Sequence, residues 1–210
     1  MKVLIVGAAG ALGVVLVHRA LKFDHQVTAM VRSPGPLSEI QDPNLTVASC
    51  DVLRESCLDT HMATQEAVIC VWGVKSTRKK VSVFSEGTDN VIRSMQRHNV
   101  RRLLCVTGIG AGDSRGHGGF VYDRIIQPLF LKTIYQDKDR QERLVEQSDR
   151  DWIIVRPATL TDGKGTGNFA VVQKMQGLTA GSISRADVAN WMVGQLELNR
   201  YLYRAVGLTN

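Results

Sequence analysis

Short apolar runs recur along the chain, and the stretches between them place apolar residues at helical spacing. We interpret as strands the runs at residues 2–6, 26–32, 45–50, 67–72, 102–107 and 152–155. Helices are predicted at 11–22, 53–62, 81–98, 133–147 and 184–198. Strands that are apolar at nearly every position are typical of parallel sheets covered on both faces. The pattern therefore predicts an α/β fold with a Rossmann-like, doubly wound parallel sheet.

The alternation continues without a linker, an internal repeat or a low-complexity tract, so we expect one domain over residues 1–210. Glycine-bearing loops at 108–119 and 161–181 follow the expected fifth and sixth strands. Ligands of open α/β sheets bind outside the carboxyl ends of the strands. Both loops are therefore candidate walls of a substrate site.

Composition excludes several classes of protein. Apolar residues make up 44% and charged residues 22% of the 210 positions, as in an average globular domain and unlike a disordered, collagen-like or disulfide-dense chain. The 4 cysteines form no C-x-x-C pair and no cluster with histidine, so no metal site is predicted. Cys70 and Cys105 lie in apolar runs, which suits buried thiols in a reducing cytoplasm.

The N-terminus imitates a secretory signal, because Lys2 precedes an apolar run that continues to Val17. Glycines divide this run, and it is shorter than the roughly 20 residues that span a membrane. We interpret it as a strand, a glycine turn and a helix, and no membrane partner is expected.

That turn carries three glycines, Gly7, Gly10 and Gly13, in the spacing G-x-x-G-x-x-G. The first permits a tight turn, the second lets the backbone approach a pyrophosphate, and the third lets the helix pack closely on the sheet. Free N–H groups at the helix start then face phosphates. A tight strand–helix turn without a ligand is the alternative, but the position between the first strand and helix favours dinucleotide binding.

The second expected strand ends at Arg32, followed by Ser33, where an NAD-preferring site places an acidic residue. A guanidinium can bind a 2′-phosphate and stack on adenine, whereas a carboxylate would repel that phosphate. The alternative is a solvated arginine at a strand end. We expect NADP(H) to be preferred over NAD(H).

The next two strand ends offer further contacts. Asp51 and Val52 follow the third strand, where the carboxylate can face the adenine amino group, cap the helix expected from Leu53, or do both. Trp72 and Gly73 end the fourth strand, and Gly73 lets the backbone pass close to the ribose or pyrophosphate. Lys75 is then in reach of a phosphate.

A family resemblance emerges from several motifs: Gly7-x-x-Gly10-x-x-Gly13, Arg32, Asp51-Val52, Ser85-Glu86-Gly87, Thr107 and Arg156-Pro157. With them the chain resembles, over nearly its whole length, the atypical short-chain dehydrogenases with an NAD(P)H-binding fold. Within that family it is most similar to the flavin reductases that also reduce biliverdin-IXβ. The resemblance implies NADPH-dependent reduction of free flavins and of some linear tetrapyrroles.

The chain also departs from that pattern. Gly108 stands where these reductases carry a serine, and Thr159 stands where they carry a histidine. There is no Tyr-x-x-x-Lys pair, because Tyr135 and Lys138 are only three apart. Carbonyl reduction needs a proton donor, so the sequence argues against a carbonyl reductase or sugar epimerase. Hydride transfer to a flavin asks mainly for stacked rings at a short distance.

The expected site residues fall into two sets. The expected substrate-side or catalytic set is Thr107, Gly108, Lys138 and Thr159. The expected cofactor-binding set is Gly7, Ala9, Gly10, Ala11, Leu12, Gly13, Arg32, Ser33, Asp51, Val52, Trp72, Gly73, Lys75, Thr107, Pro157 and Ala158.

Several positions carry an ordinary structural alternative. Lys138 and Glu142 are four apart, so they can form an ion pair on a helix surface, whereas the resemblance places the lysine beside the nicotinamide ribose. Thr107 either turns its hydroxyl to the nicotinamide or simply fits a strand. Ser184 and Asp187 have the spacing of a capping box. The apolar residues of 120–135 suit core or dimer contact, or an active-site flap.

The sequence therefore predicts an NADPH-dependent reductase of a planar small molecule, first of all a free flavin (FMN, FAD or riboflavin). The alternatives are a non-catalytic, NmrA-like NADP(H)-sensing regulator and a quinone reductase of the same fold. Lysine and arginine are scattered and aromatic residues are only 6%, so no nucleic-acid partner is expected despite the net charge of +6. The basic run at residues 75–80 is either a solvated loop or a wall facing phosphates. We expect a monomer or a weak homodimer.

Overall fold

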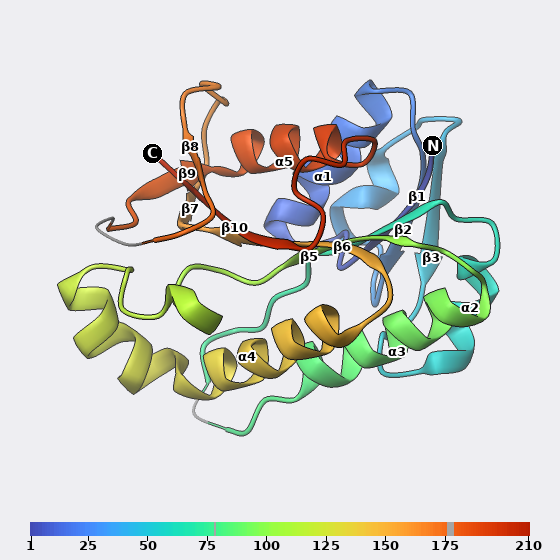
Figure 1. The fold of residues 1–210 in the computed structure, drawn as a ribbon. Coiled ribbons are helices and arrows are strands. Elements are labelled where there is room, and N and C mark those ends of the chain that lie inside the picture. The colour runs from blue at the N-terminus through green and yellow to red at the C-terminus, as the bar shows by residue number, and fades with distance from the viewer. Residues whose placement is uncertain (78, 176–178) are drawn as a thin grey trace.

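The computed structural model describes residues 1–77, 79–175 and 179–210 and centres on a twisted sheet (Figure 1). Within these residues the sheet has eight strands in the order β3-β2-β1-β4-β5-β6-β10-β8. The strands are β1 (Lys2–Val6), β2 (Gln26–Val31), β3 (Leu45–Ser49), β4 (Ala67–Cys70), β5 (Arg102–Val106), β6 (Asp151–Pro157), β8 (Ala170–Val172) and β10 (Arg204–Thr209). Neighbours from β3 to β10 pair in parallel, which confirms the Rossmann-like α/β fold, and only β8 runs antiparallel, against β10.

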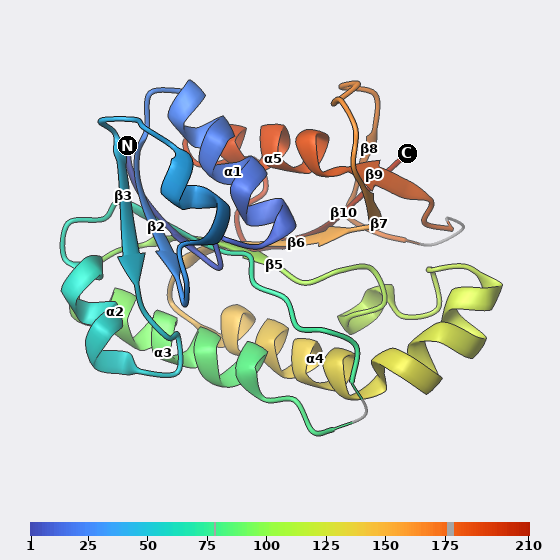
Figure 2. The ribbon, with the colours of Figure 1, turned by 180° about the vertical axis from the view of Figure 1, so that it is seen from behind.

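Helices cover both faces of the sheet (Figures 1 and 2). The face of α1 (Ala11–Lys22) and α5 (Arg185–Gly194) lies opposite the face of α2 (Glu55–Met62), α3 (Val83–Arg97) and α4 (Lys132–Gln147). The strands are buried between these layers because their side chains alternate between two apolar clusters. Ile5 packs on the α1–α5 side and Leu4 on the α2–α3–α4 side.

Helix α3 is fixed against α4 by a buried carboxylate. Asp137 of α4 accepts hydrogen bonds from the backbone N–H of Phe84 (2.8 Å) and of Ser85 (3.4 Å). It also accepts a hydrogen bond of 2.5 Å from the Ser85 hydroxyl. These bonds satisfy N–H groups at the start of α3, which carries no cap of its own. The ring of Phe84 is thereby held next to α4.

The expected elements are present, with small shifts at their ends and several additions. Strand β1 and helix α1 have the predicted bounds, and the capping box forms, because Ser184 Oγ accepts from Asp187 N at 2.9 Å. Three helices begin or end inside the expected ranges. Four strands were not predicted: β7 (Thr159–Thr161), β8, β9 (Ser182–Ser184) and β10.

A π-helical segment, η3 (Tyr122–Leu131), precedes α4 in the stretch 120–135, which we expected to form a core or dimer contact or, as the alternative, an active-site flap. Pro128 lies inside it, and a proline has no N–H for a regular α-helical bond. The apolar side chains of η3 and of the two residues before it are largely exposed, with Phe120 at 78% and Leu129 at 55%. They are therefore not part of the buried core.

Candidate functional site

A cavity of about 520 Å³ opens at the carboxyl ends of β1 to β4. Its walls come from the turn after β1, the end of β2, the loop after β3 and the segment after β4. These segments meet because carboxyl ends of parallel strands share one edge of the sheet. The size suits one half of a dinucleotide, with the remainder extending over the rim.

The turn after β1 builds the floor of the cavity from Gly7, Ala9 and Gly10. Gly7 has φ +87°, and a Cβ there would lie 2.7 Å from Trp72 Cα, so only glycine fits beside β4. Gly10 is the N-cap of α1, and within the described chain no side chain caps this helix and no acidic residue lies in its first turn. The N-terminus of α1 is thus free to bind an anion.

A positive group stands at the end of β2 on the cavity wall. Arg32 and Ser33 both line the cavity and are exposed. Among the described residues, Arg32 makes no ion pair and no hydrogen bond. A guanidinium without a carboxylate partner is available for a bidentate phosphate contact.

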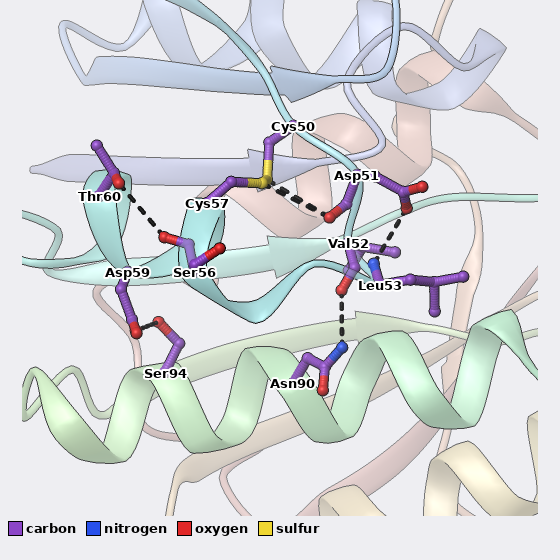
Figure 3. Close-up of a disulfide and its surroundings, with 10 residues drawn as sticks. All are labelled: Cys50, Asp51, Val52, Leu53, Ser56, Cys57, Asp59, Thr60, Asn90 and Ser94. Carbon is purple, nitrogen blue, oxygen red and sulfur yellow. Dashed lines mark hydrogen bonds between the residues drawn. A yellow bond between two sulfur atoms is a disulfide. The ribbon is translucent and has the colours of Figure 1, made fainter.

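The loop after β3 forms the opposite wall and is held from two sides (Figure 3). Asp51 Oδ1 accepts from Leu53 N at 3.0 Å, and Asn90 of α3 donates to the Val52 carbonyl at 3.1 Å. A disulfide, with a Cα–Cα distance of 5.9 Å, joins Cys50 to Cys57 of α2. Asp51 does not cap α2, which begins at Glu55. It closes the turn before the helix, and its Oδ2 accepts no hydrogen bond from the described residues.

The disulfide was not predicted, whereas Cys70 and Cys105 are buried free thiols as expected. Burial raises the pKa of the Cys70 thiol, which suppresses the reactive thiolate. We expect iodoacetamide after mild reduction of the native protein to alkylate Cys57, which is partly exposed, faster than the buried Cys50. Cys70 and Cys105 should react only after unfolding, as peptide mass spectrometry would show. Alkylation of Cys70 in native protein would contradict this burial.

A second cluster lies where β5 and β6 end. Gly108 follows β5 with φ +149°, and a Cβ at this residue would lie 3.1 Å from Tyr135 Oη and 3.5 Å from Lys138 Nζ. Lys138 donates a hydrogen bond to the carbonyl of Thr107. The backbone N–H of Ile109 donates to the Pro157 carbonyl at 3.2 Å, which joins the two strand ends. The structure therefore brings Thr107, Gly108, Lys138 and Pro157 together.

The ion pair of Lys138 with Glu142, one of the two alternatives for these positions, does not form among the described residues, because Glu142 pairs with Arg156 of β6. Both are buried, and the guanidinium binds the carboxylate through two hydrogen bonds, Nε to Oε1 at 2.9 Å and Nη2 to Oε2 at 2.7 Å. Burial opposes the charge on Arg156, but hydrogen bonds with Glu142 and Asp113 raise the pKa of its guanidinium. The Thr107 hydroxyl donates to Glu142 Oε1 at 2.6 Å, so it faces this ion pair and not the cavity.

The cavity and the second cluster adjoin each other. Trp72 and Val83 line the cavity and also pack in the apolar cluster that contains Phe84 and Tyr135. The rings of Phe84 and Tyr135 lie 5.5 Å and 5.2 Å from Lys138 Nζ. A ligand that fills the cavity and passes Trp72 would therefore reach Lys138.

Most of the predicted cofactor residues line the cavity: Gly7, Ala9, Gly10, Arg32, Ser33, Asp51, Val52, Trp72 and Gly73. Leu12 and Gly13 are buried behind the glycine turn, and Ala11 is exposed at the helix start. Lys75 and Thr159 are exposed and do not line the cavity. Ala158 is buried, with its N–H bonded to the Leu208 carbonyl at 2.9 Å. Arg78 of the basic run and positions 176–178 of the loop at 161–181 lie outside the described residues.

Sequence reasoning missed further apolar wall residues, among them Met30, Leu53 and Val83. It also missed the Glu142–Arg156 pair. The only signal for the wall was position, since Met30 precedes a strand end and Leu53 follows Asp51-Val52. Nothing local signals the ion pair, because its partners lie on different elements.

The sequence profile of the NAD(P)H-binding family matches residues 7–198. The chain belongs to this family. The match spans both the glycine turn and the cluster around Lys138, which confirms the expected family. None of the described helices is long and apolar enough to cross a membrane.

Individual relatives agree with this placement. The chain is 27% identical over 219 residues to the uncharacterized sugar epimerase YhfK of Bacillus subtilis (strain 168), covering 100% of this chain and 94% of the relative. A short-chain dehydrogenase/reductase of Veillonella parvula DSM 2008, solved in complex with NADP, has a TM-score of 0.82 at 16% identity and covers 100% and 94% of the two chains. ChuY, an anaerobilin reductase of Escherichia coli O157:H7, also has a TM-score of 0.82, at 20% identity, covering 100% and 97%. At these identities the solved structures show the shared fold.

Proposed function

We propose that the protein is an NADPH-dependent reductase whose acceptor is a planar molecule, most directly a free flavin. One observation carries the choice of cofactor: Arg32, exposed and without an acidic partner among the described residues, lines the same cavity as the glycine turn. This arrangement offers backbone N–H groups to a pyrophosphate and a guanidinium to a 2′-phosphate. The Veillonella relative solved with NADP supports the choice.

The residues present fit NADPH along the whole edge of the sheet. Gly7 and Gly10 would hold the pyrophosphate, Arg32 with Ser33 the 2′-phosphate, and Asp51 the adenine amino group. Apart from its chain neighbours, no described residue lies within 4 Å of the Cβ position of Gly73, which leaves room for the ribose. When bound, NADPH supplies a hydride from its nicotinamide ring.

The acceptor would lie over the cluster at Gly108, because the nicotinamide must be in contact with it. Exposed apolar side chains of the adjoining segment, including Phe120, Val121 and Leu129, offer a surface for a flat conjugated ring. Linear tetrapyrroles are larger conjugated acceptors of the same class, and the similarity to an anaerobilin reductase supports their inclusion. Quinones would be smaller members of it.

Replacing Arg32 by aspartate is expected to lower the ratio of NADPH to NADH affinity at least about 100-fold. Charge-assisted hydrogen bonds contribute about 1.5–3 kcal/mol, and the new carboxylate adds repulsion of the 2′-phosphate. Fluorescence titration with both nucleotides measures the ratio. R54D is the matched control, because Arg54 lies in the loop after β3 and is exposed but does not line the cavity. An unchanged ratio in R32D would show that another group selects the cofactor.

Turnover distinguishes a reductase from a nucleotide sensor. Purified protein is mixed with NADPH and FMN, and the loss of absorbance at the nicotinamide band is followed. We expect oxidation well above the protein-free rate. Tight NADPH binding without any excess oxidation would instead support the NmrA-like regulator.

A further inference from the structure

The cluster at Gly108 contains a tyrosine that cannot easily give up a proton. Tyr135 donates its hydroxyl hydrogen to the Ile109 carbonyl at 3.0 Å and accepts a hydrogen bond from Tyr122 Oη at 2.7 Å. Burial raises the pKa of the Tyr135 hydroxyl, and the neighbouring Tyr122 raises it further. A tyrosine in this state is a poor acid catalyst near neutral pH.

Unlike the Tyr135 hydroxyl, the ammonium group of Lys138 is able to give up a proton. Among the described residues its ammonium group has one hydrogen-bond acceptor, the Thr107 carbonyl, although an ammonium carries three N–H donors. Its Nζ lies 3.5 Å from the position of a Cβ on Gly108, in the space that the glycine leaves open. The residue as a whole is partly exposed.

Burial and the titratable groups around Lys138 act in opposite directions on its pKa. Burial disfavours the ammonium form, while Glu142 on α4 and Cys105 on β5 favour it, and burial prevails to lower the pKa to about 8. Phe84 on α3 offers only a ring, and the carboxylate of Glu142 is already bound by Arg156. The proton on Nζ is therefore transferable close to neutral pH.

We propose that Lys138, and not a tyrosine, is the acid of this site and holds at Nζ the proton that an acceptor takes up together with the hydride. The inference rests on the proposed reductase function and widens its acceptor class to conjugated C=O and C=N bonds. Hydride adds to one atom of the double bond, the π electron pair moves onto the oxygen or nitrogen, and that atom receives the Lys138 proton. Water then reprotonates the neutral amine, and the cofactor leaves oxidised by two electrons.

The first test measures the proton directly, without turnover. In protein labelled with ¹³Cε-lysine, the NMR shift of Lys138 should titrate near pH 8. The signal of Lys132, which is exposed on the same helix, serves as the control. K138R assigns the signal. Saturating NADP⁺ should move the Lys138 resonance and leave Lys132 unmoved. A Lys138 titration together with the other lysines, or no response to NADP⁺, would overturn the proposal even if no acceptor is ever reduced.

The second test uses the pH profile of kcat at saturating NADPH with a ketone or FMN as acceptor. Wild-type kcat should fall about tenfold per pH unit above pH 8, as Lys138 loses its proton. In K138M, kcat should no longer fall above pH 8. At pH 7 its kcat should be at least about 100-fold below that of the wild type, which is the scale of general acid catalysis. K132M should keep the wild-type pH profile. A K138M enzyme with wild-type kcat and weaker NADPH binding would make Lys138 a ribose anchor and refute its role as the acid. No turnover by the wild type would contradict the reductase function, and the NMR result would then decide on Lys138 alone.

Discussion

Replacing Arg156 by methionine is expected to lower the free energy of unfolding by about 3–5 kcal/mol, the range for breaking a buried ion pair from one side. The substitution leaves Glu142, which is 3% exposed, as a buried carboxylate whose remaining partner is the Thr107 hydroxyl. Asp113 also loses its partner, but its side chain is 81% exposed and returns to water at little cost. Urea unfolding at pH 7 measures the loss.

A double variant separates the unpaired charge from the lost packing. R156M/E142Q removes the carboxylate as well, so it should be more stable than R156M alone, although still less stable than the wild type. The coupling between the two positions should reach about 2 kcal/mol, within the range for residues in one network. If R156M and R156M/E142Q lose the same free energy of unfolding, an unpaired carboxylate on Glu142 is not the cause of the loss in R156M.

Replacing Gly13 by alanine is the second change with a large expected effect. A Cβ at residue 13 would lie 2.4 Å from the Gly7 carbonyl oxygen and 2.7 Å from that of Ala8. Both atoms belong to the backbone and cannot rotate away, so the helix must move off the turn. We expect a loss of about 3 kcal/mol in stability, at the upper end for overpacking, together with the loss of NADPH binding.

The matched control for that variant lies three residues earlier in the same turn. A Cβ at Gly10 would lie 3.3 Å from the Gly7 carbonyl oxygen and 4.0 Å from that of Val71, and Gly10 has an ordinary φ of −72°. G10A should therefore unfold within about 1 kcal/mol of the wild type but bind NADPH at least about tenfold more weakly, because its methyl group stands where the pyrophosphate approaches. If G13A and G10A lose binding and stability in parallel, the turn has a structural role only.

The sequence predicted best what a local pattern specifies. The bounds of β1 and α1 agree because a run of apolar residues, a glycine turn and a helical period follow one another without a gap. The cavity walls were found for the same reason, since each wall is a strand end. Strands β7, β8 and β9 have three residues each, too few to show a period, and they depend on tertiary pairing.

The errors at the site have a common cause. Lys138 and Glu142 are neighbours on one helix, and the sequence shows their spacing but not the arginine that approaches from β6. Arg156 donates two hydrogen bonds to the Glu142 carboxylate, and Lys138 donates to the Thr107 carbonyl instead. In the same way, the disulfide joins a strand end to a helix, and no spacing rule indicated that Cys50 and Cys57 would meet.

The most direct test of the central claim is a single turnover without oxygen. Protein saturated with NADPH is mixed with an equal amount of FMN, and the nicotinamide and flavin bands are recorded together. We predict that both bands bleach at the same rate and in equal amounts, much faster than without protein. R32D should need a higher concentration of NADPH, but not of NADH, to reach its full rate. Bleaching no faster than in the protein-free mixture, with NADPH demonstrably bound, would contradict the assignment of this protein as a reductase.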